Sequence, residues 1–146
     1  FLITGHSYGG YMTCLAMTKA ADVFDFGIAG APVTSWELYD THYTERWMDT
    51  PQDNPEGYKN GSVLSYVDNY KGTLRIMHGD MDDNVHLQNT TQLVDALTDR
   101  DVPFELMIYP GSRHGFERSK SNYDFKERVR FYYQYLLEKP VPKKLK

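Results

Sequence analysis

The stretch FLITGHSYGGYM, residues 1–12, decides the fold. A short apolar run leads into a serine that lies between two glycines, and a helical pattern follows. A Gly-x-Ser-x-Gly sequence is a weak signal by itself, but between a strand and a helix it marks a specific, sharp turn. We therefore expect a buried strand over residues 1–5, the turn at Ser7, and a helix from Tyr8 to about Ala21.

Composition excludes several classes of protein. The 146 residues are enough for one domain with its own core. The formal net charge is −4, from 16 basic and 20 acidic residues, so nothing suggests a nucleic acid or an anionic membrane as a partner. Cys14 is the single cysteine, so no internal disulfide can form. No run of about 18 apolar residues exists, so no transmembrane segment is predicted.

The rest of the chain alternates between short apolar runs and helical patterns. This order is typical of an α/β fold with a mostly parallel sheet flanked by helices. Since buried parallel strands need partners on both sides, the strand at residues 1–5 is expected to have further neighbours. Beyond residue 21, we predict strands at 26–29, 73–78 and 104–109; helices at 62–70, 86–100 and 120–138; short helices and loops over 35–61; and a loose tail at 139–146.

The last predicted helix, 120–138, is amphipathic. Its apolar side chains recur at helical spacing, which predicts one apolar face. Those side chains are Phe125, Val129, Tyr132, Tyr133, Leu136 and Leu137.

The turn at Ser7 suits a nucleophile. Side chains two residues to either side would collide in so tight a turn, and Gly5 and Gly9 remove them. The turn would raise the Ser7 hydroxyl above the strand ends and place the Tyr8 N–H at a helix start, where it can stabilise a developing oxyanion. The alternative is an ordinary glycine-rich turn in which the serine caps the helix.

A serine nucleophile needs a base, and the base needs an orienting acid. His114 follows the last predicted strand, so it emerges on the same edge of a parallel sheet as Ser7, and Gly111 and Gly115 leave its loop free to present the imidazole. The histidines at positions 6, 42, 78 and 86 are interpreted as packing, surface or helix-capping residues.

The acid should come from the preceding strand and loop, IMHGDMDDNVH, residues 76–86. Asp80, Asp82 and Asp83 all qualify, and their spacing does not choose between them. The alternative is a solvated acidic loop that caps the helix beginning near His86.

Four stretches together resemble the C-terminal half of the catalytic domain of the prolyl oligopeptidase family, and above all its dipeptidyl peptidase IV branch. They are GHSYGGYM (5–12), APVTSWELYDTHYTERWM (31–48), HGDMDDNVH (78–86) and GSRHGF (111–116). The resemblance runs from residue 1 to about 138 and implies the C-terminal part of an α/β-hydrolase fold. His6 stands where many relatives carry Trp, which we expect to alter packing beneath the turn without removing chemistry.

The resemblance implies a role for each motif. Ser7 would be the nucleophile, Asp82 the orienting acid, His114 the base, and the Tyr8 N–H an oxyanion donor. Asn84 would bind the substrate carbonyl that precedes the scissile residue. Without the resemblance, the aromatic stripe at 36, 39 and 43 would be interpreted as helical core packing. The implied pocket for a proline ring consists of Tyr8, Val33, Trp36, Tyr39, Tyr43 and Val85.

The resemblance also implies parts outside this chain. Residues 1–138 would be the C-terminal part of the catalytic domain and 139–146 a Pro/Lys-rich tail. An upstream β-propeller would bind the substrate's amino terminus, and the first half of the hydrolase domain would supply a second oxyanion donor. Because the chain opens on Phe1 and not on methionine, we interpret it as a piece of a longer protein that is weakly active or inactive alone.

The expected parent protein is a serine exopeptidase that releases di- or tripeptides after proline. Its partners would be peptides with proline near the amino terminus and a second copy of itself, with no metal or organic cofactor. A periplasmic, secreted or membrane-anchored location is favoured over the cytoplasm. The alternatives are an acyl-peptide hydrolase or esterase with the same triad, and a non-catalytic hydrolase-like binding domain.

Overall fold

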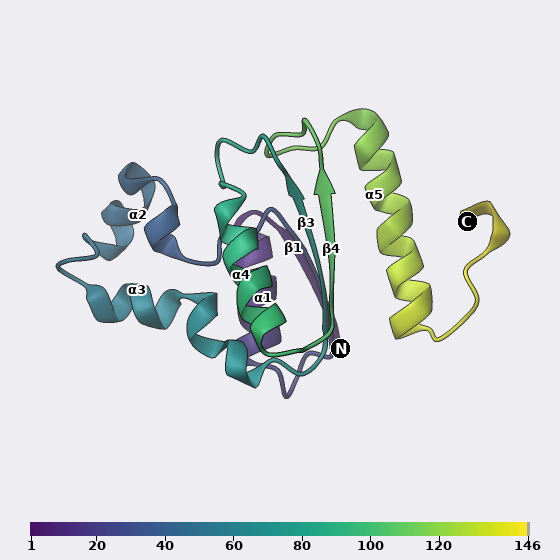
Figure 1. Cartoon of the computed structure of the whole chain (residues 1–146), viewed down its shortest axis with the longest axis horizontal. Helices are drawn as coiled ribbons and strands as arrows, with labels where there is room; N and C mark the ends of the chain where they lie inside the picture. The colour runs from purple at the N-terminus through teal and green to yellow at the C-terminus, as the bar shows by residue number, and fades with distance from the viewer. Residues whose placement is uncertain (146) are drawn as a thin grey trace.

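Four parallel strands form one sheet in the computed structural model, which describes residues 1–145 (Figure 1). The strands lie in the order in which they occur in the chain, and each neighbouring pair is parallel. Each lies within about a residue of its predicted position, and the predicted α/β class is confirmed. The strands are β1 (Leu2–His6), β2 (Phe26–Gly30), β3 (Thr73–Gly79) and β4 (Phe104–Tyr109).

Helices cover both faces of this sheet. The helices α1 (Tyr8–Lys19) and α4 (Gln88–Asp99) lie on one side of the strands and α5 (Arg118–Phe131) on the other (Figure 1). Between β2 and β3 the chain leaves the sheet and forms an insert that projects beyond α1. The insert consists of η1 (Trp36–Leu38), α2 (Thr41–Met48), α3 (Pro55–Gly61) and η2 (Val63–Asn69).

Capping side chains set the two α-helices of the insert. The Asp40 carboxylate accepts a hydrogen bond from the His42 N–H at 2.7 Å and begins α2. The Asn54 side chain accepts one from the Gly57 N–H at 3.1 Å, with Pro55 in the first turn of α3. The insert is therefore made of short helices and loops, as the sequence predicts, and the predicted helix over 62–70 is a 3-10 helix.

The alternation of β3 divides the core between the two faces of the sheet. Leu74 and Ile76 pack into the larger core with α1, α4 and the insert, whereas Met77 belongs to the smaller core beneath α5. Each core contains a helix residue that is almost fully buried, such as Leu97 of α4 and Phe131 of α5.

The predicted apolar face of the last helix is only partly correct, because Tyr132 packs against the smaller core but several of its other large side chains are exposed. Phe125 is 59% exposed and Leu137 is 48% exposed, while the side chains turned toward the sheet are those of Asp124 and Phe131. The chain also leaves the α-helical geometry after Phe131, because Tyr132–Leu136 forms a π-helical turn. Residues 143–145 of the expected loose tail form a short 3-10 turn, and residue 146 lies outside the described residues.

The reason is that the sheet face beneath α5 carries polar groups beside its small apolar core. The Tyr109 hydroxyl donates to Asp124 at 2.9 Å. The buried Arg75 guanidinium lies 3.3 Å from the Glu105 carboxylate and 3.8 Å from that of Glu127. A buried charge needs a partner, so these strand residues select the polar face of the helix and the apolar stripe is left outside.

Within residues 1–145, no helix has the length and apolarity needed to cross a bilayer.

Two leucines on strands provide a test of the core. Leu74 is fully buried and Leu106 is 41% exposed. We expect Leu74→Ala to lower the free energy of unfolding by about 2–5 kcal/mol because it leaves a cavity, and Leu106→Ala by about 1 kcal/mol at most. Urea denaturation followed by circular dichroism measures both, and equal losses would contradict this assignment of the core.

Candidate active site

Ser7 lies at a strained turn between β1 and α1. Its φ of 61° and ψ of −117° are rare for a residue with a side chain. Backbone hydrogen bonds hold this conformation: the Ser7 N–H donates to the Gly30 carbonyl at 2.8 Å, and the Tyr11 N–H donates to the Ser7 carbonyl at 2.9 Å. Among the described residues, the Ser7 side chain makes no capping bond to α1, so its hydroxyl is left for another partner.

The glycines around the turn differ in how much room the structure leaves for a side chain. A Cβ on Gly5 would lie 2.3 Å from the Gly9 carbonyl oxygen, so the predicted crowding is confirmed there. A Cβ on Gly9 would meet no atom of the described chain within 4 Å, so the predicted reason for Gly9 is wrong. The second close approach is at Gly10, whose added Cβ would lie 2.6 Å from the Gly30 carbonyl oxygen.

His114 links the two other groups of the site. Its Nε2 lies 2.9 Å from Ser7 Oγ, and its Nδ1 lies 2.9 Å from Asp82 Oδ2. Since β1 and β4 are the outer strands, three strand spacings of about 4.8 Å separate them, or about 14 Å. The loop after β4 therefore reaches back across the carboxyl edge of the sheet to bring the imidazole to the serine.

The structure distinguishes the three aspartates after β3. Asp82 is buried, and its Oδ1 accepts hydrogen bonds from the N–H groups of Asn84 at 3.0 Å and Val85 at 2.9 Å. These two bonds leave Oδ2 aimed at His114. Asp80 instead accepts from the Gly111 N–H at 2.7 Å, and Asp83 pairs with Arg113 at 2.9 Å on the surface.

The two loops that carry Asp82 and His114 are also joined through their backbones. The Met81 N–H donates to the Ser112 carbonyl at 3.0 Å. The approach is so close at Gly79 that an added Cβ would lie 2.2 Å from the Ser112 carbonyl oxygen. Only glycine permits this contact, so the relative position of acid and base is determined by main-chain packing.

His78 is buried beside Asp82. It is fully buried, with Nε2 2.7 Å from the Val85 carbonyl oxygen and Nδ1 2.6 Å from Thr90 Oγ1. Because a carbonyl only accepts, Nε2 carries the proton. Burial lowers the pKa of His78, so a neutral imidazole lies 3.4 Å from Asp82 Oδ2. It packs as the sequence suggests and is no candidate base. His42 and His86 are exposed.

The Tyr8 N–H lies where an oxyanion donor is expected. Tyr8 is the first residue of α1. The first amide groups of a helix have no acceptor inside the helix, and the helix dipole makes this end partly positive.

Five aromatic side chains cluster beside the serine. The Trp36 ring stacks on Tyr43 at 6.2 Å and lies 5.8 Å from the Tyr8 ring. The expected alternative of one helical stripe is wrong, because Trp36 belongs to η1 and Tyr43 to α2, with the Asp40 cap between them. The cluster is completed by Tyr11 and Tyr39.

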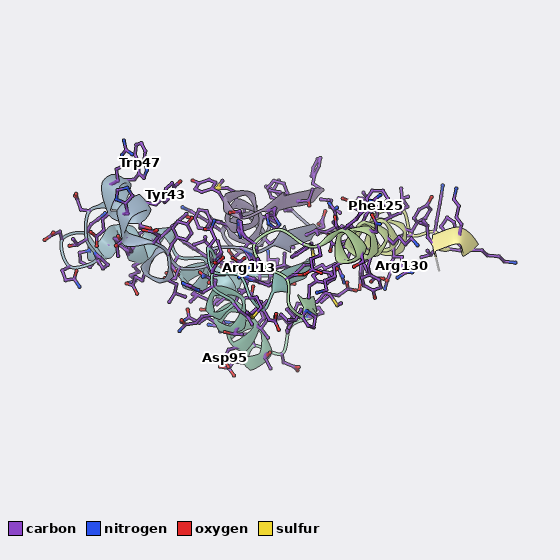
Figure 2. The ribbon with its side chains drawn as sticks, turned by 90° about the horizontal axis from the view of Figure 1, so that it is seen from above. Tyr43, Trp47, Asp95, Arg113, Phe125 and Arg130 are labelled. Carbon is purple, nitrogen blue, oxygen red and sulfur yellow. The ribbon has the colours of Figure 1, made fainter. Side chains whose placement is uncertain are left out.

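An apolar cavity of about 360 Å³ opens at this cluster. That volume is in the usual range for a small-molecule site. Figure 2 shows the side chains of Tyr43 and Trp47 together at the end of the molecule formed by the insert. The cavity is lined by the predicted Tyr8, Trp36 and Tyr43, and by Tyr11, Thr44, Trp47, Met48 and Gly61.

The sequence contained a signal for two lining residues that were not predicted. Tyr11 follows Tyr8 by three positions and Trp47 follows Tyr43 by four, so each shares a helix face with a predicted residue. No local pattern marks Gly61, which is brought to the cavity by α3 and accepts a hydrogen bond from the Tyr11 hydroxyl at 2.8 Å.

The other predicted pocket residues do not line this cavity. Val33 and Val85 are buried in the core behind the aromatic cluster. The Tyr39 hydroxyl donates to Asn84 Oδ1 at 2.7 Å, and both residues border a second, more polar cavity of about 750 Å³. The structure thus brings Ser7, His114 and Asp82 together. Of the predicted pocket residues, three line the cavity, Val33 and Val85 lie in the core, and Tyr39 bonds Asn84.

Across residues 1–145, no three or more His, Cys, Asp or Glu side chains are grouped so as to hold a metal ion. Cys14 is fully buried, and burial raises the pKa of its thiol, which makes it unreactive.

Comparison with known proteins gives consistent matches. A model described as "Prolyl oligopeptidase family" matches residues 1–139. The chain is 44% identical over 123 residues to dipeptidyl peptidase 4 of Bos taurus, which is 82% of this chain and 16% of that protein. It is 39% identical over 135 residues to dipeptidyl peptidase 8 of Homo sapiens, which is 90% of this chain and 15% of that protein.

A solved structure agrees in both sequence and fold. The crystal structure of Porphyromonas gingivalis dipeptidyl peptidase 4 matches with a TM-score of 0.81 and 41% identity, over 89% of this chain and 19% of that chain. The chain spans less than a fifth of the length of each of these relatives.

The two glycines of the motif form a matched pair for a test. We expect Gly5→Ala to destabilise the chain by about 1–3 kcal/mol, because the new Cβ meets backbone that cannot yield easily. Gly9→Ala should be neutral or stabilising by up to about 1 kcal/mol, since the site is open and alanine favours helix. Thermal unfolding of both variants measures the difference, and equal melting temperatures would contradict the contact at Gly5.

Proposed function

Because this chain belongs to the prolyl oligopeptidase family, we propose that its parent protein is a serine exopeptidase. It would release N-terminal di- or tripeptides from a substrate by cleaving after proline. The observation that carries the proposal is the hydrogen-bonded line from Ser7 through His114 to Asp82, beside an apolar aromatic cavity. A nucleophile, a base and an orienting acid in this arrangement are suited to acyl transfer.

The first half of the proposed reaction acylates the enzyme. His114 Nε2 takes the proton of the Ser7 hydroxyl while Oγ attacks the carbonyl carbon of the proline residue. The carbonyl π electrons move to its oxygen, where the Tyr8 N–H donates to the oxyanion. When the intermediate collapses, the C–N bond breaks and the imidazolium returns its proton to the leaving amine, which leaves an ester on Oγ.

The second half repeats these steps with water. His114 takes a proton from water, the hydroxide adds to the ester carbonyl, and Ser7 leaves with the proton. Asp82 stays ionised throughout and stabilises the imidazolium. Its two backbone hydrogen bonds suit that role, because they hold the carboxylate with Oδ2 toward His114 Nδ1.

We assign the apolar cavity to the proline ring. A flat, rigid pyrrolidine gains most from close contact with aromatic faces, and Trp36 and Tyr43 offer two rings inclined by 30° to each other. Val33 and Val85 act here through the core that supports those rings. The Tyr39 hydroxyl donates to Asn84 Oδ1 and so holds the side-chain amide. The N–H groups of that amide would donate to the substrate carbonyl that precedes the scissile residue.

We propose that residues 1–138 are the C-terminal part of the catalytic domain, with residues 139–146 as a tail. By the family resemblance, a second oxyanion donor and the amino-terminus binding site come from upstream parts of the parent protein. One missing donor costs on the order of 2.7–4 kcal/mol in the transition state. The 146-residue chain alone is therefore weakly active or inactive in this proposal.

The proposed assembly is a homodimer of the parent protein located outside the cytoplasm. Exposed apolar side chains on α5 and on the π-helical turn that follows it support a further contact on this face; they are Phe125, Leu136 and Leu137.

The first test removes the nucleophile. In the full-length parent protein, Ser7→Ala should lower kcat/KM for Xaa-Pro and Xaa-Xaa-Pro substrates by about 10⁴-fold or more. It should also abolish labelling by a fluorophosphonate probe. Cleavage at the parental rate would refute the nucleophile. Rapid hydrolysis of acyl esters without any preference for proline would favour an esterase or acyl-peptide hydrolase. A parent protein that the fluorophosphonate probe does not label would favour a non-catalytic binding domain.

The second test separates the proline pocket from the acyl-transfer groups. Tyr43→Ala should lower kcat/KM for Xaa-Pro substrates by about tenfold to a hundredfold, because it removes one aromatic wall. Hydrolysis of a short p-nitrophenyl ester should change by about threefold at most. Tyr123→Ala is the matched control, since the two tyrosines are 46% (Tyr123) and 45% (Tyr43) exposed. Equal effects on both substrates would contradict the pocket assignment.

A further inference from the structure

The position of the base depends on a long reach. The residues after β4 must extend across the ends of β3 and β2 to bring His114 to Ser7. The contacts already described hold this loop on its β3 side: Asp80 accepts from Gly111, Met81 donates to Ser112, and Asp82 bonds His114 Nδ1. None of these contacts comes from β1, on which the serine is mounted.

His6 provides a contact from the β1 side. Its Nε2 lies 2.8 Å from the main-chain carbonyl oxygen of His114. A carbonyl oxygen only accepts, so His6 Nε2–H is the donor and the tautomer follows. The bond joins the residue directly before the nucleophile to the residue that carries the base, across 108 positions of the sequence.

The His6 ring is held in the orientation that this bond needs. It lies 5.1 Å from the His114 ring and meets Phe116 edge-on at 5.7 Å, both ring centroids. On its other side Gly30 makes room, because an added Cβ there would lie 2.5 Å from His6 Nδ1. Phe116 in turn packs on Tyr109 at the end of β4, at 4.6 Å.

Desolvation of the imidazole favours the neutral form of His6. Partial burial lowers the pKa of His6, and the neighbouring His114 imidazole adds to this, whereas the His114 carbonyl and the carboxylates of Asp82 and Asp124 act in the opposite direction. A neutral His6 adds no positive charge 5.1 Å from the imidazolium that His114 becomes during acyl transfer.

We propose that His6 is a positioning residue, whose Nε2–H ties the base-bearing loop to the nucleophile strand and so holds His114 Nε2 within reach of Ser7 Oγ. This inference rests on the proposed function of the triad. It goes beyond it because His6 touches neither substrate nor reacting atoms. A misplacement of about 1 Å in a reacting group can cost about a hundredfold in rate. Loss of the His6 hydrogen bond should therefore lower kcat.

The test compares two replacements in the full-length parent protein. His6→Phe keeps a ring and loses the donor, whereas His6→Gln keeps an N–H donor at similar reach. We expect the Phe variant to lower kcat for a Xaa-Pro substrate by about tenfold to a hundredfold with KM within about twofold. The rate of Ser7 labelling by a fluorophosphonate should fall in parallel. The Gln variant should recover kcat to within about threefold of the parent.

The controls separate this inference from the proposed function. His42→Phe and His42→Gln change an exposed histidine and should leave kcat unaltered. Ser7→Ala must abolish turnover; if it does not, the proposed function fails whatever His6 does. If Ser7→Ala is inactive but the Phe and Gln variants of His6 have equal kcat, the tether is overturned. Should the Phe variant not fold, His6→Ala against His6→Gln gives the same contrast.

Discussion

The hydrogen bonds from Ser7 through His114 to Asp82 join groups carried by β1, β3 and the loop after β4, and so cross the four strands of this chain. The surrounding structure holds these three residues in contact. The serine is mounted at the end of one outer strand and the base on the loop after the other. Such a meeting is possible because the strands are parallel, so all their carboxyl ends lie on one edge. Asp82 follows β3, which lies between β1 and β4. Its carboxylate can therefore bond His114 where the loop after β4 crosses toward Ser7.

Main-chain contacts, and not side-chain size, control the precision of this edge. The close approaches at Gly5, Gly10 and Gly79 each bring two backbones together where a Cβ would not fit. Backbone positions vary little at room temperature compared with long side chains, so a site built on them loses less entropy when substrate binds. The strained φ at Ser7 is maintained by the same contacts, through the carbonyl of Gly30.

The two faces of the sheet carry different chemistry. The α1 and α4 side is an ordinary apolar core that extends into the insert and ends in the aromatic cavity. The α5 side is a small apolar core beside buried charged pairs of Arg75 with Glu105 and Glu127. The charges face inward there, so the apolar stripe of α5 faces out, as Figure 2 shows for Phe125.

The sequence by itself determined the alternation of strands and helices, the turn at Ser7 and the order of serine, acid and base, because these depend on local periodicity and on which residues follow strand ends. Spacing left Asp80, Asp82 and Asp83 equivalent, and within the sequence only the family resemblance selected Asp82. The tertiary structure shows that Asp82 faces His114, since two N–H groups of its own loop orient it. It also decided which face of α5 is buried and that Gly61 completes the cavity. Those two outcomes depend on contacts between elements far apart in the chain, which no local pattern records.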